Sequence, residues 1–411
     1  FLIGALAGSW LISGVIPTMV FYGLKILHPS YFLPASVIVC AVVSLATGSS
    51  WGTTATIGIA LMGIGETMGM NGAMVAGAVI SGAYFGDKLS PMSDTTNLAA
   101  VMAGTDLFTH IRYMAYTTIP SIVITLIIFL ILGFTIETKT DAANVQSILD
   151  TIQSKFYISP VLLLVPAVVI FLIVKKVSAV PALLIGTLLG AVAAIIFQPG
   201  IIESVSGVKG NYAYASYKAS VDSMFGSVTM LEDGNSMQRL LSTRGMEGMM
   251  NTIWLIICAM AFGGVMEACG LLQKITSTVV SIAKSTGSLI ATTASTCVFF
   301  NATAADQYLA IVVPGRMFAD TYRDRGLAPE NLSRTLEDSG TVTSVLFPWN
   351  TCGAAQSSIL HVATGEYWMY CFFNLISPLM TILFGYLNIK IRRFEPSEIA
   401  ENKAADLFVN D

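Results

Sequence analysis

The chain has 411 residues, of which 54% are hydrophobic and 11% are charged, and its mean hydropathy is +0.72. This composition is too apolar for a soluble protein of such length and indicates a membrane protein. Lys plus Arg number 21 and Asp plus Glu number 25, which gives a net charge of −4. Because no basic stripe is present, nucleic-acid binding is excluded as a main role.

Several apolar stretches reach the roughly 20 residues that a helix needs to cross the hydrocarbon core of a bilayer. We expect these to be ordinary spans. They are 1–27, 113–134, 158–174 with its flanks, 180–197, 251–270 and 368–389. The six cysteines lie singly inside apolar runs, so we interpret them as small core residues rather than metal ligands.

Four other apolar stretches are interrupted by small polar residues, and neither half of any of them is long enough to cross alone. The interruptions fall in corresponding places in the two halves of the chain. The stretches are 32–65 broken at 47–54, 73–103 broken at 86–97, 286–315 broken at 301–306, and 333–362 broken at 348–353.

Each half of the chain therefore has the order span, broken pair, broken pair, span, which predicts an all-α polytopic membrane protein with inverted repeats at 1–134 and 251–393. Clusters of Lys and Arg near 316–334 and after 389 are expected to be cytoplasmic. With that orientation, 32–65 and 286–315 are re-entrant hairpins, while 73–103 and 333–362 are broken transmembrane helices. We expect eight crossings and two hairpins.

The remaining segments connect the repeats. We expect 135–198 to be a connecting loop with a pair of scaffold helices, 199–250 an extracellular linker that ends in an interfacial helix, and 394–411 a cytoplasmic tail. The second repeat has two additional helices ahead of its linker and the first has none. Two more helices are therefore expected before Phe1.

The broken segments predict a cation site. Non-helical backbone survives at membrane depth only where it is packed in protein or lines a cavity, and half-helix C-termini expose carbonyl oxygens. The segments 47–54 and 86–97 are rich in hydroxyl and carboxylate oxygens and contain no His, which favours a small hard cation over a transition metal.

Asp94 is the main candidate, because it stands where the second half of a broken helix begins, among hydroxyl groups. It could hold either Na⁺ or a proton, which is the minimum that an antiporter requires. Asp87 and Asp306 are expected to be supporting carboxylates. Neutral oxygens would come from Ser49, Ser50, Thr53, Ser93, Thr95, Asn97, Asn301 and Asn350. The expected Na⁺ ligands are Asp94, Thr95, Asn97 and Ser50.

Structural roles compete with these assignments. Ser93, Asp94 and Thr95 could simply cap a half-helix, and Asp87 could pair with Lys88 at the membrane surface. Glu337 and Asp338 stand near the end of a span, so we expect them at the interface. We expect His110 in a loop.

The runs 46–53 (ATGSSWGT) and 86–98 (GDKLSPMSDTTNL), followed by 103–106 (AGTD), closely resemble the NhaC family of sodium/proton antiporters along the whole chain. The resemblance implies an elevator-type transporter with a dimer-forming scaffold, hence a homodimer in the lipid bilayer, and a location in the bacterial inner membrane. It implies no cofactor, since Na⁺ and H⁺ are the cargo. The family also contains exchangers of malate and lactate.

Secondary active antiport, with Na⁺ moving out against H⁺, is the leading hypothesis. A carrier for small carboxylates coupled to Na⁺ and H⁺ is the alternative, because the break near 348–356 offers amides, hydroxyls and half-helix N-termini. An intramembrane hydrolase with Ser49 or Ser50 as nucleophile lacks a convincing base in either oxygen-rich segment. A passive channel fits duplicated, inverted hairpins less well than alternating access does.

Overall fold

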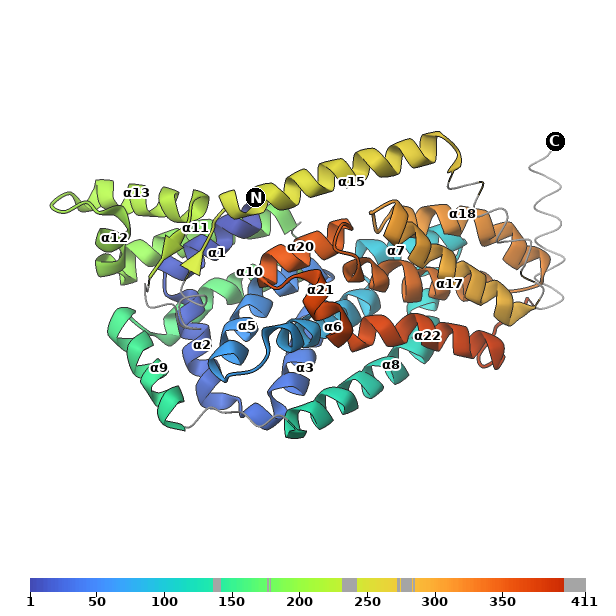
Figure 1. Ribbon diagram of the computed structural model, residues 1–411, viewed down its shortest axis with the longest axis horizontal. Helices are drawn as coiled ribbons and strands as arrows, with labels where there is room; N and C mark the ends of the chain where they lie inside the picture. Colours follow the sequence, from blue (N-terminus) through green and yellow to red (C-terminus); the bar gives the residue numbers. More distant parts are fainter. Residues whose placement is uncertain are drawn as a thin grey trace. The chain divides into compact units, whose positions relative to one another are not determined.

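The computed structural model describes residues 1–135, 142–175, 177, 179–230, 242–271, 274, 283 and 285–394 (Figure 1). Contacts divide the chain into two compact units. Unit 1 comprises 1–87, 125–257 and 354–372, and unit 2 comprises 88–124, 258–353 and 373–411. The expected cytoplasmic tail from residue 395 onward and residues 231–241 of the linker lie outside the described residues.

The described part of the chain is mostly helical and is a multi-pass membrane protein by the length and hydropathy of its helices. Four helices could each cross a membrane, or up to seven if each bent helix pair is one span. The four are Pro29–Thr47, Leu107–Thr135, Val180–Phe197 and Glu247–Met266.

The first stretch that the sequence suggests as one span is bent in the structure. Helix α1 (Leu2–Ile12) and helix α2 (Val15–Ile26) meet at an angle of 70°. Gly14 lies between them with φ of +75°, a left-handed conformation that glycine adopts without strain, which explains why the helix breaks there.

Unit 1 packs α1 against α11 (Ala179–Phe197) and α13 (Tyr212–Phe225). A Cβ atom on Gly8 of α1 would lie 1.8 Å from the backbone oxygen of Ser223, so glycine permits this close approach. The linker region ends in a short strand pair, β1 (Val228–Thr229) with β2 (Ser242–Thr243). The neighbouring elements are α9 (Ala142–Lys155), η2 (Pro160–Leu163), α10 (Leu164–Val174), α12 (Pro199–Ser206), η3 (Glu247–Met249), α15 (Met250–Ala268), α21 (Thr364–Tyr367) and η6 (Trp368–Tyr370).

The first broken stretch begins with α3 (Pro29–Thr47), which ends at Gly48 with φ of +66°. Ser49 then caps the short helix α4 (Ser50–Thr53), accepting a hydrogen bond from Gly52 N at 3.0 Å. A π-helix η1 (Thr54–Gly58) and helix α5 (Ile59–Thr67) complete the stretch. The break therefore falls inside the interval predicted from the sequence.

The second broken stretch consists of α6 (Gly72–Leu89) and α7 (Asp94–Ala103). Helix α6 continues past Gly86, where the break is expected to begin, and ends at Leu89. The chain passes from unit 1 to unit 2 between Asp87 and Lys88. The extended α8 (Leu107–Thr135) follows. Within unit 1, α6 lies close to α3, where Ser44 donates a hydrogen bond to Ala83 O at 2.6 Å.

Unit 2 is built from α7, α17 (Thr286–Thr303), α18 (Leu309–Asp324) and α19 (Pro329–Leu336), which pack on one another. After α19 the helix widens into a π-helix η4 (Glu337–Thr341), tightens into η5 (Ser344–Leu346), and resumes as α20 (Thr351–Leu360). Helix α22 (Phe372–Tyr386) follows. Both C-terminal stretches are thus interrupted where the sequence indicates.

The expectation that all six cysteines are core residues is wrong for two of them. Cys258 and Cys269 are exposed, whereas the other four are buried. Cys258 lies on α15, an apolar helix whose described side chains are largely exposed. Apolar composition identifies a membrane helix, but it does not distinguish a side chain that faces protein from one that faces lipid.

The close approach of α6 to α3 yields a prediction. A Cβ atom on Gly82 would lie 2.2 Å from Val37 O, so Gly82→Ala should destabilise the protein by about 1–3 kcal/mol through overpacking. Gly200→Ala, on α12, meets nothing within 4 Å and serves as the control. Thermal unfolding of the purified protein in detergent measures both, and equal transition temperatures would contradict the packing.

Candidate functional site

The π-helix η4 places two carboxylates in the interior of unit 2. A π-turn leaves backbone carbonyls without their usual helical partners, and such turns are frequent at functional sites. Three side-chain amides from neighbouring segments donate to carbonyls in and just after the turn: Asn301 to Gly340 O at 2.6 Å, Gln307 to Thr341 O at 3.4 Å and Asn374 to Val342 O at 2.8 Å. Glu337 and Asp338 on this turn are both fully buried.

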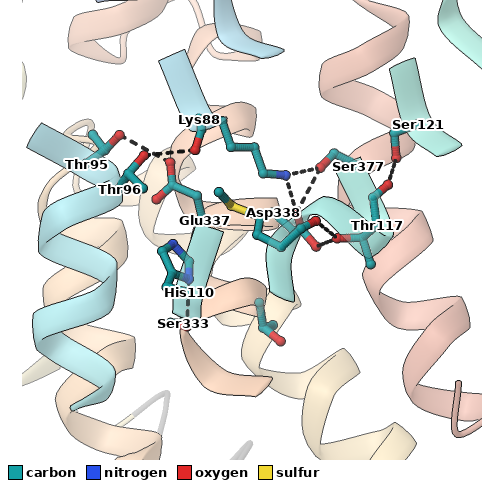
Figure 2. A network of polar contacts seen from close by, with 12 residues as sticks. Lys88, Thr95, Thr96, His110, Thr117, Ser121, Ser333, Glu337, Asp338 and Ser377 are labelled. Carbon is teal, nitrogen blue, oxygen red and sulfur yellow. Dashed lines mark hydrogen bonds and ion pairs between the residues drawn. The ribbon is translucent and has the colours of Figure 1, made fainter. Parts of the chain in front are cut away.

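Asp338 forms a buried ion pair with Lys88, the first residue of unit 2, and both side chains are 0% exposed (Figure 2). The ammonium group of Lys88 also donates to Ser377 Oγ at 2.9 Å. Thr117 of α8 donates to Asp338 Oδ2 at 2.8 Å, and Ser121 donates to Thr117 O at 2.7 Å. The charge of Asp338 is therefore balanced by one cation and supported by hydroxyl donors.

Glu337 lies beside Asp338 on the π-turn, toward α7 (Figure 2). Its Oε1 accepts a hydrogen bond from Thr95 Oγ1 at 3.2 Å, and Thr95 lies 3.0 Å from Ser93 Oγ. Thr96 donates to Lys88 O at 3.0 Å. The N-terminal turn of α7 thus supplies hydroxyl groups to Glu337 and to the backbone carbonyl of Lys88.

Burying charged groups is expensive unless they are paired and hydrogen-bonded, and loss of one partner from a buried pair is typically destabilising by about 3–5 kcal/mol. Ionised side chains inside a membrane protein are rare and tend to mark ion or substrate pathways. Two adjacent carboxylates, one ammonium group and several hydroxyls form a site where a small hard cation could exchange with a proton. We call Lys88, Glu337, Asp338, Thr95, Thr117 and Ser377 the buried polar network.

Asp94, the main candidate from the sequence, is the first residue of α7 and its side chain is exposed. Its Oδ2 accepts a hydrogen bond from the hydroxyl of Tyr308. The next residue, Thr95, is buried and contacts Glu337. Asp94 therefore stands at the surface, one residue from the buried polar network, and its role as the ion carrier stays a prediction.

The other predicted site residues of unit 2 mainly form hydrogen bonds with backbone atoms. Asn97 Nδ2 donates to Ser93 O at 2.6 Å, and Asp306 Oδ1 accepts from Leu309 N at 3.0 Å. Asn350 Nδ2 donates to Asn301 O at 3.0 Å. The structure thus brings Asn301 and Asn350 together, and it gives Asp306 a capping contact at the start of α18.

The predicted groups of unit 1 gather around the start of α4. Asp87 is 5% exposed, and its Oδ2 accepts a hydrogen bond from Ser50 N at 3.1 Å. Thr53 donates to Ser49 O at 2.9 Å. Ser50 belongs to unit 1 and the other three predicted Na⁺ ligands to unit 2, so this ligand set stays a prediction.

Three expectations about charged residues are wrong. Glu337 and Asp338 are fully buried rather than interfacial, because they find partners on α6, α7 and α8. Lys88 is buried and pairs with Asp338, so the alternative interpretation, a surface pair between Asp87 and Lys88, does not hold. His110 lies on α8 rather than in a loop, fully buried and 2.8 Å from Ser333 Oγ. Lys88, the one cation within the stretch 73–103, was the sequence signal that could have indicated a buried carboxylate partner.

Comparison with known proteins shows to which family this chain belongs. The sequence profile described as "Na+/H+ antiporter family" matches residues 82–389, which include Lys88, Glu337 and Asp338. The chain belongs to the Na⁺/H⁺ antiporter family. It is 39% identical over 391 residues to the Na⁺/H⁺ antiporter NhaC of Alkalihalophilus pseudofirmus, covering 95% of this chain and 81% of that protein.

Other relatives in this family have different cargo in their names. The malate-2H⁺/Na⁺-lactate antiporter of Bacillus subtilis is 37% identical over 386 residues, 93% of this chain and 79% of the relative. The arginine/ornithine antiporter ArcD of Halobacterium salinarum is 36% identical over 412 residues, 98% and 81% of the two chains. The resemblance to NhaC is confirmed, and this family member is a transporter rather than a hydrolase. The family implies no cofactor.

The Lys88–Asp338 ion pair yields a stability prediction. Lys88→Met leaves a buried carboxylate without its cation and should lower the free energy of unfolding by about 3–5 kcal/mol. Lys88→Met combined with Asp338→Asn removes the uncompensated charge and should recover part of the loss. Lys209→Met, at an exposed lysine, is the control. Denaturation in detergent measures the wild type, these three variants and Asp338→Asn alone, and effects of the two single variants that add up in the double variant would contradict the pair.

Proposed function

We propose that the chain exports Na⁺ in exchange for H⁺ by alternating access, and that the exchange occurs at Glu337 and Asp338. The family supports Na⁺/H⁺ antiport. The observation that carries the assignment of the site is the full burial of both carboxylates on one π-turn, with Lys88 paired to one of them.

Charge balance gives the mechanism. With Glu337 protonated, the site formed by Lys88, Asp338 and Glu337 has no net charge, so a Na⁺ ion that joined it would leave an unbalanced positive charge in surroundings of low effective dielectric. Release of one proton, from Lys88 or from a protonated Glu337, removes that imbalance. Na⁺ and this proton therefore exclude each other, and each can leave only when the other arrives.

Hydroxyl oxygens would complete the coordination of Na⁺. Thr95 contacts Glu337, and Thr117 and Ser377 contact Asp338, so three hydroxyls already surround the two carboxylates. Hard cations prefer such oxygen ligands. Each hydroxyl can turn its hydrogen away and offer a lone pair when a cation replaces the ammonium group of Lys88.

The groups predicted from the sequence enter the proposal as an outer set. Asp94 is the exposed carboxylate that a cation would meet before the buried polar network, since Thr95 joins it to Glu337. Asp87 and Asp306 are supporting carboxylates, and neutral oxygens come from Ser49, Ser50, Thr53, Ser93, Asn97, Asn301 and Asn350. Several of these atoms now cap backbone, so they could bind Na⁺ only after those contacts open.

The fold-level expectations remain part of the proposal. Two inverted repeats, re-entrant hairpins, elevator-type movement, a homodimer and a location in the bacterial inner membrane are supported by the broken helices at matching places in both halves and by the family resemblance.

Transport by the purified protein in liposomes tests the site. Asp338→Asn and Glu337→Gln should each reduce Na⁺-driven proton flux to near background, because a side-chain amide can neither release a proton nor balance the charge of Na⁺. Glu366→Gln, at an exposed carboxylate, should leave the flux unchanged. Wild-type flux in Asp338→Asn would contradict the assignment.

The variant Asp94→Asn tests whether Asp94 is an outer group or the ion carrier itself. If Asp94 is an outer group, the variant should need a higher Na⁺ concentration for half-maximal flux while its maximal rate stays within about twofold of wild type. Complete loss of flux at every Na⁺ concentration would instead make Asp94 the carrier, as the sequence alone suggests.

Exchange of a small carboxylate is a second candidate. The named malate and lactate relative favours it, and so does Gln356 of α20, which is fully buried while neither atom of its side-chain amide has a hydrogen-bond partner among the described residues. Counterflow of labelled malate or lactate into preloaded liposomes distinguishes the two functions, since an exchanger of Na⁺ and H⁺ alone would take up neither acid.

A further inference from the structure

Arg334 of α19 is a buried cation that the proposed exchange reaction does not use. Its side chain is 0% exposed, and it ranks among the largest fully buried side chains of the described residues. No carboxylate of the described residues forms an ion pair with it within 4.0 Å. Its Nε and Nη2 atoms have no hydrogen-bond partner in the described part of the chain.

The surroundings of Arg334 hold the guanidinium group in one place. It stacks on the ring of Tyr113 with 4.7 Å to the ring centroid, and on Phe384 with 5.9 Å. Its Nη1 donates to Lys390 O at 3.3 Å. Arginine keeps its charge even where it is buried, and aromatic rings partly compensate it. The positive charge is therefore fixed in the interior of unit 2.

Arg334 lies partway along a series of polar contacts between α8 and the α19–η4 segment. At one end Thr117 contacts Asp338, and two turns earlier on α8 His110 contacts Ser333 (Figure 2). Tyr113, between His110 and Thr117, donates to Asn331 Oδ1 at 2.7 Å. On the α19–η4 segment itself, Arg334 precedes Asp338 by four residues, which is about one helical turn.

The far end of this series reaches the surface. Glu330, one turn before Arg334, is 4% exposed in its side chain and pairs with Arg392, which is 45% exposed, at 2.5 Å. The backbone of Arg392 also contacts Tyr113, donating to its hydroxyl at 2.9 Å. Separate polar contacts thus recur along this helix pair from Asp338 to the surface at Lys390–Arg393, which we expect from the sequence to be cytoplasmic.

We propose that Arg334 is the barrier that prevents Na⁺ from leaving the buried polar network along this series of polar contacts, so that Na⁺ reaches and leaves the site only from the α7 side. The inference rests on the proposed exchange at Glu337 and Asp338. A fixed positive charge about 10 Å from a passing cation, at an effective dielectric constant near 20, slows the passage roughly 15-fold. A polar path without such a charge would leak Na⁺ and uncouple it from H⁺.

The experiment measures coupling in liposomes that contain the full chain. Efflux of ²²Na⁺ and entry of protons, reported by a trapped pH dye, are recorded together for the wild type, Arg334→Gln and Arg334→Lys. Arg393→Gln, which removes an exposed arginine from the same surface, is the control. Circular dichroism and gel filtration establish that each protein is folded.

Arg334→Gln should show Na⁺ efflux without matching proton entry, with the uncoupled flux raised about tenfold or more. Arg334→Lys, which keeps the charge, and Arg393→Gln should stay coupled. Folded Arg334→Gln with wild-type coupling would overturn the proposal. If Arg334→Gln is not recovered folded, Arg334→Met, which is similar in length and also lacks the charge, is measured in its place: uncoupled Na⁺ efflux supports the proposal, and coupled exchange overturns it.

The two proposals fail in different ways. If the wild type exchanges Na⁺ for H⁺ and Asp338→Asn does not, the exchange site stands whatever Arg334→Gln does. If Asp338→Asn exchanges like the wild type, the site assignment fails, and a leak in Arg334→Gln would then carry no meaning for this pathway.

Discussion

The structure depends on how unit 2 accommodates charge and unpaired backbone inside an apolar helical protein. The π-turn at Glu337–Thr341 disturbs regular helical hydrogen bonding and buries two carboxylates at once. Either feature alone would be strongly unfavourable in hydrocarbon. Both are tolerated because amides of Asn301, Gln307 and Asn374 bind carbonyl oxygens in and just after the turn, and because Lys88 balances Asp338.

The interactions that stabilise the buried charges are also the ones that the proposed transport reaction uses. Lys88 comes from the end of α6, Thr95 from α7, Thr117 from α8 and Ser377 from α22, so four segments are joined at one point by the carboxylates of the π-turn. When Glu337 is protonated, the ammonium group of Lys88 and the carboxylate of Asp338 leave the site neutral, and it accepts another monovalent cation only by releasing a proton. The interactions that make the buried charges tolerable therefore also make Na⁺ and H⁺ compete.

The sequence predicted the helical membrane class, the family and the positions of the four helix breaks, because length, apolar composition and Gly-, Ser- and Asn-rich interruptions are local properties. The break after Thr47 follows from Gly48 and Ser49 themselves. The bend at Gly14 was missed, since one glycine inside an apolar stretch is a weak signal.

The buried site was harder to predict, because burial is decided by partners distant in the sequence. Asp338 and Lys88 are 250 residues apart, and nothing beside Asp338 indicates that an ammonium group lies against it. Asp94 stood out for the opposite reason: its neighbours in sequence are hydroxyl residues, although its own side chain is exposed. Local composition identified the segment that approaches the site but not the carboxylates at its centre.

Proton release on Na⁺ binding tests the central claim most directly. Purified protein in weakly buffered detergent solution is titrated with NaCl while a pH indicator records released protons, with choline chloride as the control for ionic strength. The account predicts that the wild type releases protons in proportion to bound Na⁺ and that Asp338→Asn releases almost none. Equal proton release by both proteins would contradict it.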